Sequence, residues 1–123
     1  MTRSEDVPVP ADGDLVEVAD LPAALTAATL VFDDGATQVF SEDGRTTYVE
    51  RGRQTTGEWS VSPDGTFSST WPPDYRATYA VRWIVEGDGP VGLSFTDARS
   101  GRRFDGRYRR PGAIRHLAGE TSG

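Results

Sequence analysis

Apolar and polar residues alternate over much of this chain, a pattern typical of β-strands that bury one face. The alternation is clearest in residues 75–85, where one face comprises Tyr75, Ala77, Tyr79, Val81, Trp83 and Val85. Eight such runs predict strands: 29–32, 36–41, 45–50, 54–62, 66–71, 75–85, 91–97 and 102–109. In 36–41 and 45–50, two sets of side chains compete for the inner face, so their facing stays open.

Clusters of Gly, Pro and Asp separate these runs at nearly regular intervals. Seven of them lie at 33–35, 42–44, 50–52, 63–65, 72–74, 86–89 and 99–101. Each has a turn mechanism, because Gly permits positive φ, Pro presets φ, and Asp bonds its own backbone. Short strands joined by turns, with no intervening helices, predict an all-β fold, an antiparallel up-and-down barrel of eight strands.

The chain is organised as one domain between two tails. Residues 1–19 are rich in Pro, Asp and Gly, and we expect them to form a flexible acidic tail. Asp20 and Pro22 then predict the start of a short helix that closes one end of the barrel. The barrel domain therefore spans residues 20–110, and residues 111–123 are expected to form a second flexible tail.

The inner faces of the predicted strands carry most of the aromatic residues. They include Trp59, Trp71, Trp83, Tyr75, Tyr79, Tyr108, Phe67, Phe95 and Phe104. One interpretation is a packed core, since aromatic rings fill small barrels well. The other is a ligand cavity, because several buried O–H and N–H groups need partners that a dry core does not supply.

Tyr48 and Glu50 form the most informative pair for chemistry, because residues two apart share a strand face. If both point inward, a carboxylate among aromatic rings is a plausible proton donor or base, and inward tyrosines such as Tyr108 bind a developing oxyanion. The alternative places Val49 inside and Glu50 in the following turn. The candidate catalytic residues are therefore Glu50, Tyr48 and Tyr108.

The candidate substrate-binding residues are the inward aromatics and one arginine. They are Trp59, Phe67, Trp71, Tyr75, Arg76, Tyr79, Trp83 and Phe95. Arg76 binds a substrate carboxylate only if it turns inward or lies at the barrel mouth, and a surface ion pair is the alternative. The sequence contains no metal-ligand pattern or phosphate loop, and its one histidine, His116, follows the last strand, so no cofactor and no metal are expected.

Composition narrows the partners. The formal net charge is −6, and the 13 basic residues are all Arg. The absence of Lys and Asn, whose codons are AT-rich, points to a high-GC genome such as that of an actinobacterium. Residues 99–115 carry seven arginines and one aspartate. This segment has three alternative interpretations: an anion-binding patch, a solvated edge strand, or a docking site for the acidic tail. With no apolar stretch that could span a membrane or serve as a signal peptide, a cytoplasmic protein with no membrane or nucleic-acid partner is expected.

A resemblance to the calycin superfamily adds to this. Gly57-Glu58-Trp59-Ser60-Val61, Asp64-Gly65-Thr66-Phe67 and Trp71 resemble the cadence of small bacterial lipocalin-like domains, over roughly residues 27–110. The resemblance implies a lipocalin-like barrel around a cavity. Phenolic acid decarboxylases share that barrel and act without a cofactor through an Arg, a Glu and inward tyrosines, with Tyr48, Glu50 and Arg76 as loose counterparts by type. Similar barrels serve as cyclases and isomerases in actinobacterial natural-product pathways.

Three functional hypotheses follow. The first is a cofactor-independent enzyme, of isomerase, cyclase or decarboxylase type, acting on a small hydrophobic or aromatic metabolite. The second is a non-catalytic carrier or sensor of the same ligands. The third is an interaction module whose arginine-rich segment meets an acidic partner. A homodimer joined through strand edges is also left open, because eight such strands could instead form an open sheet.

Overall fold

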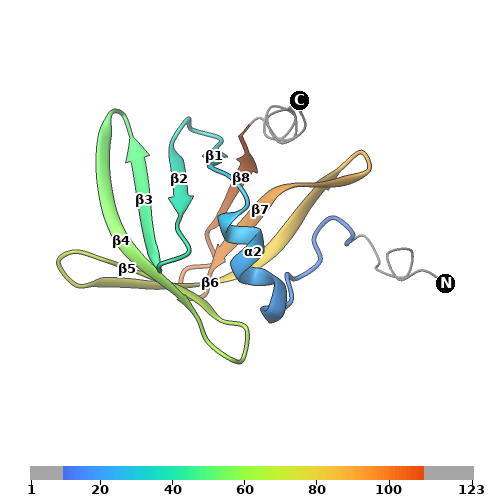
Figure 1. Cartoon of the computed structure of the whole chain (residues 1–123), viewed down its shortest axis with the longest axis horizontal. Helices are drawn as coiled ribbons and strands as arrows, with labels where there is room; N and C mark the ends of the chain where they lie inside the picture. Colours follow the sequence, from blue (N-terminus) through green and yellow to red (C-terminus); the bar gives the residue numbers. More distant parts are fainter. Residues whose placement is uncertain (1–9, 110–123) are drawn as a thin grey trace.

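The computed structural model describes residues 10–109 as a closed antiparallel β-barrel preceded by one short helix (Figure 1). A 3₁₀ turn, η1 (Val18–Asp20), leads directly into helix α2 (Leu21–Thr26). The strands are β1 (Leu30–Phe32), β2 (Thr37–Phe40), β3 (Arg45–Glu50), β4 (Arg53–Val61), β5 (Phe67–Trp71), β6 (Tyr75–Glu86), β7 (Gly89–Asp97) and β8 (Arg103–Tyr108). The predicted fold class is confirmed, and each strand lies where the alternation predicted it.

The strands form a simple meander in which every strand pairs with the next, and β1 pairs with β8 to close the ring. Leu30 lies opposite Tyr108, and Phe32 lies opposite Gly106. The open-sheet alternative is therefore wrong. A dimer joined through the edges of an open sheet has no basis in this structure, because the closed ring of the described strands leaves no such edges. β8 is likewise not an edge strand, because it has a neighbour on both sides.

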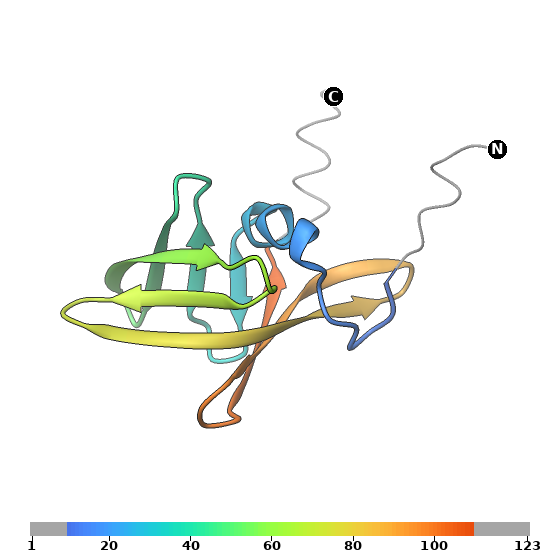
Figure 2. The ribbon, with the colours of Figure 1, turned by 90° about the horizontal axis from the view of Figure 1, so that it is seen from below.

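Helix α2 covers the end of the barrel at which β2 and β8 finish (Figures 1 and 2). Its apolar face buries Leu21 and Leu25, which pack in one cluster with barrel residues such as Leu30 and Phe40. Pro22 lies in the first turn as predicted, but Asp20 makes no side-chain capping bond. A helix of six residues is too short to be stable alone, so this packing maintains it.

The segment before η1 is bound to the barrel, which corrects part of the predicted tail. The Gly13 N–H donates to the Trp83 carbonyl at 2.9 Å, and the Val16 N–H donates to the Val81 carbonyl at 2.9 Å. Asp12 accepts from the Val85 N–H, also at 2.9 Å. β6 is twelve residues long and its pairing with β5 ends at Tyr79, so the rest of that edge needs another partner. The parts of the predicted tails at 1–9 and 110–123, with His116, lie outside the described residues.

The inner face of β6 also departs from strict alternation at its two ends. Tyr75, expected inside, is 55% exposed, whereas Ile84, expected outside, is buried. The register between β6 and β7 shifts between Ile84 and Val85, and such an irregularity rotates side chains away from the alternating pattern.

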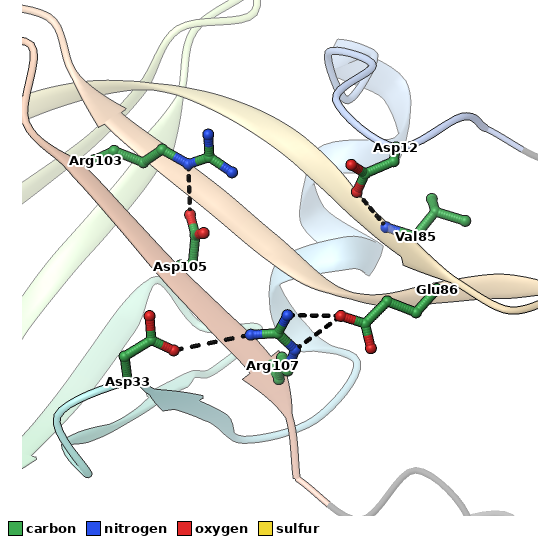
Figure 3. A network of polar contacts seen from close by, with 7 residues as sticks. All are labelled: Asp12, Asp33, Val85, Glu86, Arg103, Asp105 and Arg107. Atoms are coloured by element: carbon green, nitrogen blue, oxygen red, sulfur yellow. Dashed lines mark hydrogen bonds and ion pairs between the residues drawn. The ribbon is translucent and has the colours of Figure 1, made fainter.

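The arginines of β8 are paired with nearby carboxylates (Figure 3). Arg107 contacts Glu86 at 2.6 Å and Asp33 at 3.8 Å, and Arg103 contacts Asp105 at 2.8 Å. These pairs partly neutralise the basic run within the described part of the chain. Because they are substantially exposed, each contributes little to stability.

Among the described helices, neither is long and apolar enough to cross a bilayer.

The buried helix face predicts a stability difference between two leucines. Leu25 is 0% exposed and Leu15 is 56% exposed. Leu25→Ala leaves a cavity beneath α2 and is expected to lower the free energy of unfolding by about 2–4 kcal/mol. Leu15→Ala, the same change at the surface, is expected to stay within about 0.5 kcal/mol. Urea unfolding followed by circular dichroism measures both; equal losses would contradict the role assigned to α2.

Candidate ligand cavity

A cavity of about 240 Å³ lies inside the barrel. Its lining residues are Phe32, Gln38, Phe40, Tyr48, Phe67, Ser69, Trp71, Tyr79, Phe95 and Phe104. The cavity extends toward the end opposite α2, because β1, β3 and β5 finish there with Phe32, Tyr48 and Trp71 near their ends, and β8 begins there. The short strands and tight turns thus bring side chains from seven strands, all except β4, to one space.

The floor of the cavity is continuous with the apolar core. The Phe40 and Phe67 rings meet edge to face with centroids 5.6 Å apart, and Phe95 meets Phe67 in the same way at 5.7 Å. These three rings also belong to the cluster that packs beneath α2. Both interpretations drawn from the sequence therefore apply to different parts of the barrel. The inner aromatic residues form a packed core at the helix end and line a cavity toward the opposite end.

A few neutral polar groups interrupt the aromatic lining. Gln38 donates a hydrogen bond from Nε2 to Thr46 Oγ1 at 2.8 Å, and the Thr46 hydroxyl donates one to the Val39 carbonyl at 2.9 Å. Across the cavity, Trp71 donates from Nε1 to Ser69 Oγ at 3.1 Å. Because Ser69 accepts this bond, its hydroxyl proton is left to be donated to another group.

Both cavity tyrosines are held in their neutral form. Burial, followed by the carboxylates of Glu50 and Asp34, raises the pKa of the Tyr48 phenol. Burial also raises the pKa of Tyr79, with smaller contributions from Tyr75 and Asp97, and a hydrogen bond with Ser69 acts against them. At neutral pH these side chains are phenols that can donate or accept a hydrogen bond, not phenolates.

The structure resolves the facing of β3. Tyr48 lines the cavity, so the alternative that placed Val49 inside is wrong. Glu50 follows on the same side of the strand, but it is exposed at the β3–β4 turn, opposite Arg53. It lies close enough to influence the Tyr48 phenol without being enclosed by aromatic rings. Glu50 is the last residue of β3, so it lies at the end of the strand and not within the cavity, which alternation alone does not reveal.

Five other predicted site residues lie outside the cavity lining. Trp59 donates to the Ser41 carbonyl at 2.9 Å and packs on Phe40, while Tyr108 donates to the Ala24 carbonyl at 2.7 Å. Both are at or near the end that α2 covers. Trp83 packs against the apolar core cluster. The remaining two, Tyr75 and Arg76, are exposed at the start of β6.

The structure brings together four of the predicted substrate contacts and adds others. The predicted residues in the lining are Phe67, Trp71, Tyr79 and Phe95, together with Tyr48. Gln38, Ser69, Phe32, Phe40 and Phe104 were not predicted as contacts. Gln38 shares its strand face with Phe40, so the facing of Phe40 was the signal that could have found it. Within residues 10–109, no cluster of three or more His, Cys, Asp or Glu side chains could hold a metal ion.

Comparisons with protein-family models, with curated proteins and with solved structures found no match to this chain. The chemistry of the cavity is therefore the basis for a functional argument.

Gly57 is the residue that allows Trp71 to sit against the barrel wall. A Cβ at this position would lie 2.4 Å from the Thr70 carbonyl oxygen and 2.7 Å from the Trp71 ring. We expect Gly57→Ala to displace Trp71 and lower the free energy of unfolding by about 1–3 kcal/mol. Gly89→Ala is the matched control, since a Cβ there meets nothing within 4 Å. Thermal unfolding and tryptophan emission test this, and unchanged emission from Gly57→Ala would contradict it.

Tyr108 is predicted to act on stability and not on the ligand. Burial raises its pKa from 10.0 to about 12. The phenol ionises first in the unfolded chain, so its contribution to stability is complete below pH 10 and is lost as the pH rises through about 12. Tyr108→Phe should cost about 1 kcal/mol at pH 7, where the bond to Ala24 is lost, and this deficit should shrink above pH 10. Urea unfolding at pH 7 and pH 11 measures it; a constant difference would contradict the assignment.

Proposed function

We propose that this barrel is a small-molecule binding protein whose cavity holds one flat, largely apolar molecule, as a carrier or sensor of aromatic metabolites. The observation that supports this is the space of about 240 Å³ inside the barrel, with aromatic walls and a few neutral polar groups. Binding sites for small molecules typically combine an apolar lining with a small number of placed polar atoms. We also propose that the protein is related to the calycin superfamily and that it is located in the cytoplasm.

The cavity volume sets the size of the ligand. An engineered protein cavity of about 150 Å³ accommodates benzene. The space here is about 240 Å³, which fits a fused bicyclic ring with a small substituent. Edge and face contacts with the lining rings would favour a planar aromatic ligand over an aliphatic one of equal volume.

The chemistry of the lining favours binding over catalysis. Within the described residues, the lining contains no carboxylate, imidazole or guanidinium. Its ionisable groups are the phenols of Tyr48 and Tyr79, whose pKa values are raised, so neither is a base at neutral pH. Efficient acid–base catalysis needs a group with a pKa near the working pH.

A second candidate is a cofactor-independent enzyme of isomerase, cyclase or decarboxylase type, as in natural-product pathways. The observation in its favour is the position of Tyr48, a neutral phenol in the cavity with the Glu50 carboxylate nearby. In an isomerisation, Tyr48 would donate its phenol proton to one substrate atom and the Glu50 carboxylate would accept a proton from another; transfer of that proton from Glu50 to the Tyr48 phenolate would restore both groups. Glu50→Gln would then abolish turnover while ligand binding survives.

The test is a titration of the protein with uncharged monocyclic and bicyclic aromatic compounds. Binding is measured by calorimetry and by the change in tryptophan emission. Saturable one-to-one binding is expected, with a preference for the bicyclic compounds. Trp71→Phe should remove most of the emission change because Trp71 lines the cavity, whereas Trp59→Phe, the matched control, should retain it. The absence of saturable binding across the panel would refute the proposal. Conversion of a bound compound, lost in Tyr48→Phe, would favour the enzyme.

A further inference from the structure

The charged groups around the cavity are unevenly placed. Carboxylates stand beside Tyr48: Asp34 in the β1–β2 turn, fixed by the Ala36 N–H at 3.0 Å, and Glu50 at the end of β3. Both act on the Tyr48 phenol through space, and Asp97 acts similarly on Tyr79. The two phenols that a ligand would meet therefore lie in a negative field.

Arginines also lie near two of these carboxylates, Asp97 and Glu50. Arg102 lies over the Phe104 ring, 5.1 Å from its centroid, and together with Arg99 it acts on Asp97. Arg53 faces Glu50 across the β3–β4 turn, with no ion pair formed between them. None of these guanidinium groups belongs to the lining.

The lining also favours one kind of polar atom on the ligand. Tyr48 and Tyr79 each carry a hydroxyl that can donate a hydrogen bond, whereas the Ser69 hydroxyl is already engaged with Trp71 and Tyr79. The Gln38 amide oxygen is an acceptor in the lining, whereas the phenols of Tyr48 and Tyr79 are donors; a ligand oxygen with free lone pairs is the group that these phenols match best. A carbonyl oxygen has this property and carries no net charge.

We infer, resting on the proposed function, that the cavity selects an uncharged aromatic carbonyl compound and rejects the corresponding carboxylate. A buried carboxylate without a cationic partner carries a large desolvation cost. Here that cost would be increased by repulsion from Asp34 and Glu50. A neutral ketone avoids both the desolvation cost and the repulsion, and it still accepts a hydrogen bond from a cavity phenol.

Three compounds of nearly equal shape separate these effects: 2-acetylnaphthalene, 2-ethylnaphthalene and 2-naphthoate. Calorimetry at pH 7 is expected to show that the ketone binds about fivefold more tightly than the hydrocarbon, which corresponds to one hydrogen bond. The carboxylate is expected to bind at least about tenfold more weakly than the hydrocarbon. Naphthoate binding as tightly as the ketone would overturn the inference.

Matched variants assign each effect to its residue. The preference for ketone over hydrocarbon should fall in Tyr48→Phe or in Tyr79→Phe and persist in Tyr75→Phe, because Tyr75 is 55% exposed outside the lining. Glu50→Gln should strengthen naphthoate binding about threefold, whereas Glu58→Gln, an exposed position on the outer face of β4, should leave it unchanged. A preference that survives both cavity variants would overturn the assigned donors.

Two failures remain distinguishable. If none of the three compounds binds, the proposed function itself fails. If 2-ethylnaphthalene binds saturably but naphthoate binds equally well or better, the cavity is a ligand site and only the inferred charge selectivity is wrong. Loss of that naphthoate binding in Arg102→Gln would then show that the ligand reaches the guanidinium at the rim.

Discussion

The pairing of β1 with β8 is the interaction on which the rest of the structure depends. It involves only three residues of β1, from Leu30 to Phe32, yet it turns a meander of hairpins into a closed ring. Closure defines an inside, and every inward side chain then faces others across a small space. Without it, the same aromatic residues would form one face of an open sheet, and no enclosed volume would exist.

The closed ring is completed differently at its two ends. At one end, α2 brings Leu21 and Leu25 over the floor rings, and Tyr108 ties the helix to β8. No equivalent element covers the other end within residues 10–109, where turns carrying Asp34 and Glu50 surround Tyr48. As a result, the apolar core lies at the helix end of the barrel and the cavity at the other end, near the carboxylates of Asp34 and Glu50.

The long β6 strand leaves backbone groups that its neighbour β5 does not pair. β5 covers only the part of its edge up to Tyr79, so the backbone from Val81 to Val85 requires another partner. Residues 12–16 meet that requirement although their composition resembles a flexible tail. A segment whose composition is typical of a flexible tail can thus be ordered by backbone hydrogen bonds, to which the Asp12 carboxylate and the buried Val16 side chain add.

The sequence by itself determined the strands, the turns and the short helix, because alternation and turn chemistry are local properties. It also identified Phe67, Trp71, Tyr79 and Phe95 as inward residues, all of which line the cavity. Tertiary structure alone decided which inward residues face the ligand space and which face the helix, as Tyr108 and Trp59 do. The reason is that alternation reports the face of a strand but not the height along the barrel, and height is fixed only when β1 meets β8 and α2 closes one end.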